Sequence, residues 1–69
     1  MPTSRDVVRF LRKKGFIEKR QRGSHLILQN PNTGYRTVVP VHPGDLPKGL
    51  FLKILKDAGF SLEEYLSKK

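Results

Sequence analysis

The sequence FIEKRQRGSHLILQNPNTGYRTVVPV, residues 16–41, carries the pattern from which the fold is predicted. Its first part, residues 16–22, predicts a strand, in which Glu18 and Arg20 alternate with Ile17 and Lys19. Residues 25–28, HLIL, form a second short run that favours a strand. Gly23 and Ser24 lie between the two runs and favour a tight turn. We therefore expect the chain to reverse direction there, between two strands.

The second half of the stretch predicts a third strand. Residues 30–34, NPNTG, are a dense cluster of turn formers, so the strands on either side are expected to meet in a hairpin. In residues 35–41, alternation places Tyr35, Thr37, Val39 and Val41 on one face. Pro40 has no N–H to donate to a ladder, which predicts that this strand is an edge there or is ending.

The residues before the strands predict an amphipathic helix over residues 4–14. Thr3 or Ser4 is suited to cap it, and Asp6 lies in the first turn, where negative charge is favoured. Gly15 is suited to end it in a left-handed conformation. One arc is apolar and the opposite arc is cationic. The apolar arc contains Val7, Val8, Phe10 and Leu11, and the cationic arc contains Arg5, Arg9, Arg12 and Lys13.

Two helices are expected after the strands. Pro47 opens the first at a position that tolerates its missing N–H, and Gly59 ends it. Ser61 and Glu64 form a capping box for a short last helix over residues 62–67. The predicted order is α-β-β-β-α plus a short C-terminal helix. The fold class is α+β, with the helices packed on one face of a small antiparallel sheet.

Length and composition set further limits. The chain of 69 residues is enough for one small domain, residues 1–69, and it is globular in composition, with 36% hydrophobic and 29% charged residues. It has no apolar run near the ~18 residues of a membrane span, so we expect no membrane association. Residues 1–6 turn basic before any apolar stretch, so we also expect no signal peptide. It also has no cysteine, which excludes disulfides and thiolate sites and fits a reducing cytoplasm.

Positive charge is concentrated in the first half of the chain. The net charge is +8, and residues 1–36 carry all the arginines and nine of the fourteen basic residues, with only two acidic ones. Such an asymmetric basic footprint favours a polyanionic partner, nucleic acid above all. The alternative is an ordinary solubilising surface.

Most catalytic and metal-binding patterns are missing. No glycine-rich run matches a phosphate loop or a dinucleotide fingerprint. Two histidines without cysteine are too few for a recognisable zinc site, and the scattered carboxylates do not suggest a magnesium site. We therefore expect neither a metal nor a cofactor.

What remains is His25, directly after a cation cluster formed by Lys19, Arg20 and Arg22. Metal-free RNA cleavage needs a base for the 2′-hydroxyl, cations for the phosphorane and an acid for the leaving 5′-oxygen. Histidine suits proton transfer near neutral pH, and cations stabilise the transition state. The alternative for His25 is a half-buried strand residue without a task.

Other residues have weaker claims. His42 is a candidate second proton carrier, or a loop residue that bonds the backbone. Ser24 and Arg36 join Lys19, Arg20 and Arg22 as candidate RNA or phosphate ligands. Tyr35 and Phe51 are of the type that stacks bases, but aromatic residues at these spacings more often belong to a core.

Several segments together resemble the HicA toxins, also called YcfA-like proteins. They are Gly15-Phe16, RQRGSH over residues 20–25, VPVHP over residues 39–43, and residues 50–61, in which Leu50 precedes ILK-x-AGFS. The likeness covers nearly the whole chain, and the combination is more specific than any one piece.

The resemblance implies a fold similar to a double-stranded-RNA-binding domain. It also implies an mRNA interferase, a toxin of a type II toxin–antitoxin pair that arrests growth by degrading transcripts. The family's catalytic histidine follows a Gly-Ser step, which here falls on His25. The implied partners are mRNA, a HicB-type antitoxin that covers the active site, and operator DNA only through the antitoxin complex.

Two other functions share the basic surface. One is a small RNA-binding domain without catalysis, and the other is a protein-interaction subunit whose cations meet an acidic partner. RNA that stays intact in the presence of the protein favours the first, and association with an acidic protein but no RNA favours the second.

Overall fold

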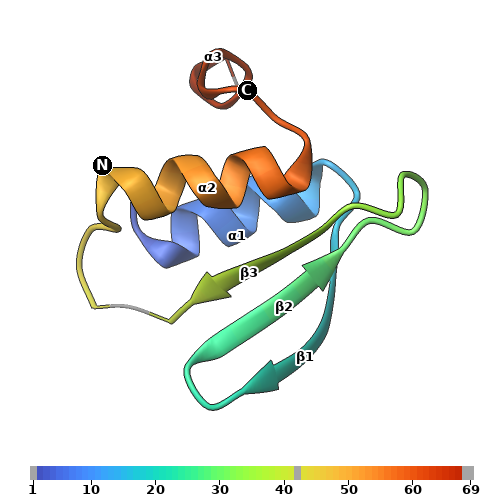
Figure 1. Cartoon of the computed structure of the whole chain (residues 1–69), viewed down its shortest axis with the longest axis horizontal. Coiled ribbons are helices and arrows are strands. Elements are labelled where there is room, and N and C mark those ends of the chain that lie inside the picture. Colours follow the sequence, from blue (N-terminus) through green and yellow to red (C-terminus); the bar gives the residue numbers. More distant parts are fainter. Residues whose placement is uncertain (1, 42, 68–69) are drawn as a thin grey trace.

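A computed structural model describes residues 2–41 and 43–67. The elements follow the expected order (Figure 1). They are α1 (Ser4–Lys13), β1 (Ile17–Arg22), β2 (His25–Gln29), β3 (Arg36–Pro40), α2 (Lys48–Ala58) and α3 (Leu62–Leu66). This is an α+β fold of the double-stranded-RNA-binding type, α-β-β-β-α with a short C-terminal helix, as the sequence predicts.

The three strands form one antiparallel sheet in the order β1-β2-β3. β3 is therefore an edge strand, as Pro40 indicates. Leu28 pairs with Thr37, and Leu26 pairs with Val39. Thr37 and Val39 are buried beneath the helices. Helices α1 and α2 cover this face of the sheet (Figure 1), and they leave the other face open.

The helix ends follow the predicted caps. The hydroxyl of Thr3 accepts a hydrogen bond from the Asp6 N–H, and the Asp6 carboxylate accepts one from the Thr3 N–H. Gly15 has a φ of +98° just after α1, a backbone conformation that suits glycine. Ser61 and Glu64 form the same reciprocal box at α3.

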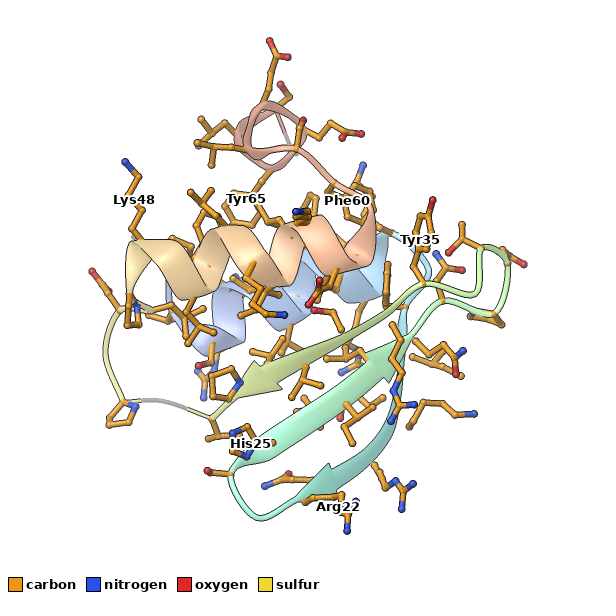
Figure 2. The ribbon with its side chains drawn as sticks, viewed as in Figure 1. Arg22, His25, Tyr35, Lys48, Phe60 and Tyr65 are labelled. Atoms are coloured by element: carbon orange, nitrogen blue, oxygen red, sulfur yellow. The ribbon has the colours of Figure 1, made fainter. Side chains whose placement is uncertain are left out.

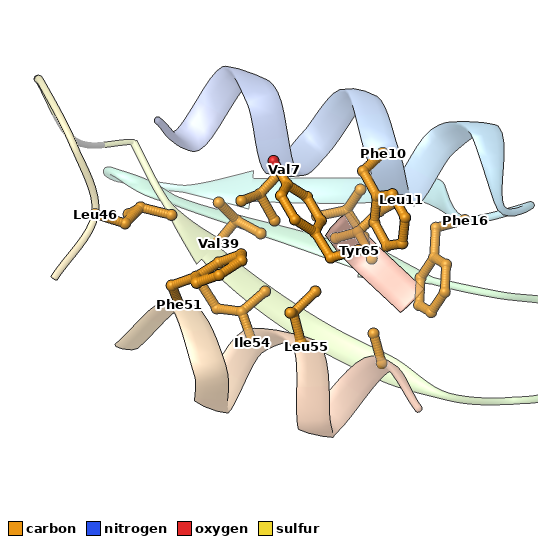
Figure 3. Packing of buried hydrophobic residues seen from close by; sticks show 12 residues of the cluster. Val7, Phe10, Leu11, Phe16, Val39, Leu46, Phe51, Ile54, Leu55 and Tyr65 are labelled. Carbon is orange, nitrogen blue, oxygen red and sulfur yellow. The ribbon is translucent and has the colours of Figure 1, made fainter. Parts of the chain in front are cut away.

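The core lies between the two long helices and the sheet (Figure 3). Tyr65 of α3 is 4% exposed, and its ring meets Phe10 of α1 and Phe51 of α2 edge-on at centroid distances of 4.8 and 5.0 Å. The short last helix is therefore held by one aromatic residue between α1 and α2. Phe51 belongs to this core and is 1% exposed, so it cannot stack on a base.

A buried asparagine joins the end of α1 to the β2–β3 turn. The side-chain amide of Asn30 donates to the Lys14 carbonyl at 3.1 Å, and its side-chain oxygen accepts from the Asn32 N–H at 2.8 Å. Asn30 is 5% exposed. The turn cluster thus positions the sheet against the helix as well as reversing the chain.

The predicted element bounds differ from the structure at a few residues. Phe16 lies in the core rather than in β1, and Pro47 is the N-cap of α2 rather than its first helical residue. Tyr35 and Val41 flank β3 and are 52% and 54% exposed, so only Thr37 and Val39 of the expected face are buried.

Candidate functional site

His25 is the first residue of β2 and lies at the closed end of the β1–β2 hairpin (Figure 2). It is in register with Arg22 of β1 and with Pro40 of β3. Side chains of directly opposed residues lie on the same face of a sheet. The His25 imidazole and the Arg22 guanidinium therefore share one face at the same end of the sheet.

The turn that presents His25 needs its glycine. Arg22 and His25 pair across a two-residue loop, in which Gly23 has a φ of +59° and Ser24 has no positive φ. A positive φ at the first loop position alone is the pattern of a type II′ hairpin. The Gln21 side-chain amide donates to the Gly23 carbonyl at 2.9 Å, and this hydrogen bond also stabilises the loop.

The structure places His25 on the open face of the sheet. Its neighbours Leu26 and Leu28 face the helices, so alternation places His25 and Ile27 on the opposite side. His25 is exposed to solvent, so a ligand has direct access to the ring. The next register pair joins Arg20 to Ile27, which adds a second guanidinium to this face.

Arg20 and Arg22 carry positive charge that no described carboxylate neutralises. The ion pairs within residues 2–41 and 43–67 are Arg9–Asp6, Arg12–Glu18 and Lys53–Asp57. Two of the cations on the outer arc of α1 are therefore paired, whereas the two arginines of β1 are not. This contrast favours β1 over α1 as the contact for phosphate.

The other predicted phosphate ligands are Lys19, Ser24 and Arg36, and they lie at different places relative to His25. Lys19 lies at a β-bulge, where the register shifts between Glu18 and Arg20. Ser24 is in the turn, and its carbonyl accepts from the Val41 N–H. Arg36 pairs with Gln29 at the other end of the sheet, four residues and roughly 13 Å from His25 along the strand. The structure thus groups Arg20, Arg22, Ser24 and His25 and separates Arg36.

His42, the candidate second proton carrier, lies outside the described residues. Its proposed role stays a prediction. Within the described residues, no three side chains of the metal-ligating types come together in a way that would hold an ion, and no described helix has the length and apolar character needed to cross a membrane.

One feature of the site is not indicated by the sequence alone. His25 also borders a hollow of about 330 Å³, whose other side is formed by α2 and includes Lys53 and Asp57. Helical periodicity assigns these two residues to a solvated outer face. Only the packing of α2 beside the edge strand brings Lys53 and Asp57 to the same hollow as His25. No local sequence pattern indicates this arrangement.

Comparison with known proteins gives one family. A family model described as the HicA toxin of bacterial toxin–antitoxin systems matches residues 4–60. This range spans α1, the complete sheet, α2 and His25. A search of curated protein sequences gave no match.

Proposed function

Because the chain belongs to the HicA toxin family of bacterial toxin–antitoxin systems, we propose that it is an mRNA interferase. Its reaction is metal-independent endonucleolytic cleavage of mRNA in the cytoplasm, and His25 is the general base or one half of a base/acid exchange. The observation that carries the proposal is the register pair of an exposed His25 with Arg22, on an open face that also holds Arg20.

The proposed reaction starts from groups that lie on this face. The neutral His25 ring takes the proton of a ribose 2′-hydroxyl. The 2′-oxygen then forms a bond to the adjacent phosphorus, and the bond from phosphorus to the 5′-oxygen breaks. The leaving 5′-oxygen takes a proton from an acid, for which His42 or the protonated His25 is the candidate.

Arg22 and Arg20 supply the electrostatic part of the reaction. A guanidinium offers several N–H donors in a fixed plane and matches two phosphate oxygens at once. The negative charge on the phosphorane grows toward the transition state, so cations placed beside it beforehand lower the barrier. Lys19 and Ser24 extend the phosphate contacts along the hairpin.

The proposed antitoxin partner fits the same face. Ile17 and Val38 are 48% and 39% exposed, and both lie in register positions on the open face. A HicB-type antitoxin with an acidic and apolar surface would cover these side chains together with His25, and operator DNA would be bound only by that complex. The simplest check for this partner is whether a reading frame that encodes an acidic protein lies next to the gene.

The test of the ribonuclease proposal is cleavage of a defined RNA by purified protein in EDTA. We expect the wild type to cleave and His25→Ala to bind the RNA without cleaving it. Gln29→Ala is the matched control, because Gln29 lies on the same face of β2 at its other end. Cleavage by His25→Ala would remove His25 from the mechanism, and loss of wild-type cleavage in EDTA would remove metal independence.

A non-catalytic RNA-binding domain is the second candidate. The observation that favours it is that none of the side-chain hydrogen bonds among the described residues involves the His25 ring, whereas catalytic histidines are commonly oriented by such a partner. RNA that stays intact after prolonged incubation with equimolar wild-type protein would support this reading over the first.

A further inference from the structure

The hollow beside His25 has the size and lining of a site for a small planar ligand. It lies between the edge strand β3 and helix α2, and its volume of about 330 Å³ is at the lower end of the range for ligand sites. Its walls are apolar and consist of Val38, Pro40, Leu50 and Ile54. Such walls favour the faces of an aromatic ring over a sugar or a phosphate.

The rim of the hollow carries one cation and one anion. Lys53 Nζ lies 2.8 Å from Asp57 Oδ2, and the two side chains are 69% and 39% exposed. Both heads are therefore within reach of a ligand. The rim offers a strong donor beside a strong acceptor, since an ammonium only donates and a carboxylate only accepts.

The fold itself gains little from Asp57. It lies in the last turn of α2, where the helix macrodipole disfavours a negative charge. Lys53 precedes it by four residues, which is the less favourable order for such a pair. The carboxylate therefore has no strong structural reason to lie at this rim.

We propose that this hollow is a subsite for a guanine base of the RNA substrate. The Watson–Crick edge of guanine presents two adjacent donors, N1–H and the 2-amino group, beside the acceptor O6. Asp57 matches the two donors and Lys53 matches O6, through charge-assisted bonds. Adenine and cytosine place a ring-nitrogen acceptor beside their amino group, and uracil has a single donor, so all three fit the pair less well.

The backbone of β3 adds a second set of polar groups. The Val41 N–H donates to the Ser24 carbonyl, so these two residues are a hydrogen-bonded pair of the β2–β3 ladder. Because such pairs alternate along an antiparallel ladder, the N–H and C=O of Val39 point toward β2, and those of Val38 point away from it. Val38 lines the hollow. A splayed base in the hollow therefore meets backbone groups at its rim, as is usual in recognition of single-stranded RNA.

This proposal rests on the proposed ribonuclease function for the identity of the ligand. His25 borders both the open face and the hollow, so a base held there belongs to a nucleotide next to the bond that is cleaved. We therefore expect cleavage to occur beside guanosine more often than beside the other nucleosides.

The test measures binding separately from cleavage. Pentamers of 2′-O-methyl RNA lack the free 2′-hydroxyl and stay intact. One has guanine at its centre, one has hypoxanthine, which lacks only the 2-amino group, and one has adenine. We expect the wild type to bind the guanine pentamer about tenfold more tightly than the hypoxanthine one, as for a hydrogen bond to a charged group.

Variants assign the preference to the rim. Asp57→Asn should reduce the guanine preference to less than twofold, while Glu63→Gln, which removes an exposed carboxylate from α3, should keep it. Circular dichroism and thermal melting check that Asp57→Asn is folded. Cleavage sites of the wild type on a long RNA should cluster at guanosine, and those of Asp57→Asn should not.

Each outcome separates the two proposals. Equal binding of all three pentamers by a wild type that still cleaves RNA overturns the subsite and leaves the ribonuclease. A guanine preference in a wild type that does not cleave supports the subsite and overturns the ribonuclease. A folded Asp57→Asn that keeps its preference, or that loses only its affinity for the antitoxin, overturns the assignment of the hollow to a base.

Discussion

The ring of Tyr35 lies so close to Gly59 that a Cβ atom at Gly59 would be 2.4 Å from Tyr35 Cε2. Gly59 also has a φ of +86° at the C-terminal end of α2. Both the space and the backbone conformation therefore require glycine. The contact joins the start of β3 to the end of α2, at the end of the sheet opposite His25 (Figure 2), which leaves Tyr35 a packing role far from the site.

Gly59→Ala should lower the free energy of unfolding by about 2–3 kcal/mol, through the left-handed backbone and the crowding against the ring. Urea denaturation of Gly59→Ala, Tyr35→Ala and the double variant separates the backbone contribution from the crowding contribution. The free energy of unfolding of the double variant should fall by less than the sum of the two single decreases, because removing the ring removes the crowding. Simple additivity would mean that the ring moves aside at no cost.

Thr37→Val tests the link between the edge strand and α2. The buried Thr37 hydroxyl donates to the Ile54 carbonyl at 3.0 Å, and valine keeps the shape without the donor. We expect a loss of about 1 kcal/mol in unfolding free energy, measured by urea denaturation. Unchanged stability would show that this bond adds nothing to the packing of α2.

Asn30→Ala should lower the free energy of unfolding by about 2 kcal/mol, more than Thr37→Val does. It removes hydrogen bonds to the Lys14 carbonyl and from the Asn32 N–H at a buried position. The matched control is Asn32→Ala, which lies in the same turn with an exposed side chain. Thermal or urea unfolding of both variants gives the comparison. Equal losses would contradict a special role for the buried amide.

Arg22→Ala and Lys48→Ala remove the same charge from different places. Arg22 is in register with His25, whereas Lys48 begins α2 away from the hairpin (Figure 2). With uncleavable single-stranded RNA, we expect Arg22→Ala to reduce the slope of log K against log salt by roughly 0.7, the value for one phosphate contact. Lys48→Ala should leave it unchanged. Identical slopes would mean that only the net charge matters.

The parts of the fold that depend on local chemistry could be predicted from the sequence. The capping boxes at Thr3 and Ser61, and the glycines that follow α1 and α2, set the helix bounds to within about a residue. The turn formers between the strands likewise locate both reversals. In each case the decisive groups lie within a few residues of one another.

The orientation of His25 could not be predicted in this way. Residues 25–28 are nearly apolar throughout, so alternation alone allows His25 to lie on either side of the sheet. The choice depends on Leu28 pairing with Thr37 beneath α2, a contact between distant segments. The same holds for Asp57, whose place beside the site depends on the packing of α2 against an edge strand.

The hollow and the hairpin have a consequence for how the protein is made. The far wall of the hollow comes from residues 50–57, which are synthesised after all three strands. Helix α2 also supplies Phe51, Ile54 and Leu55 to the core that supports the sheet. A nascent chain that ends before α2 therefore has neither a firm platform for His25 nor a complete site. On the proposed mechanism, a transcript that is being translated is safe from its own unfinished product, and RNA cleavage begins only after synthesis has passed α2.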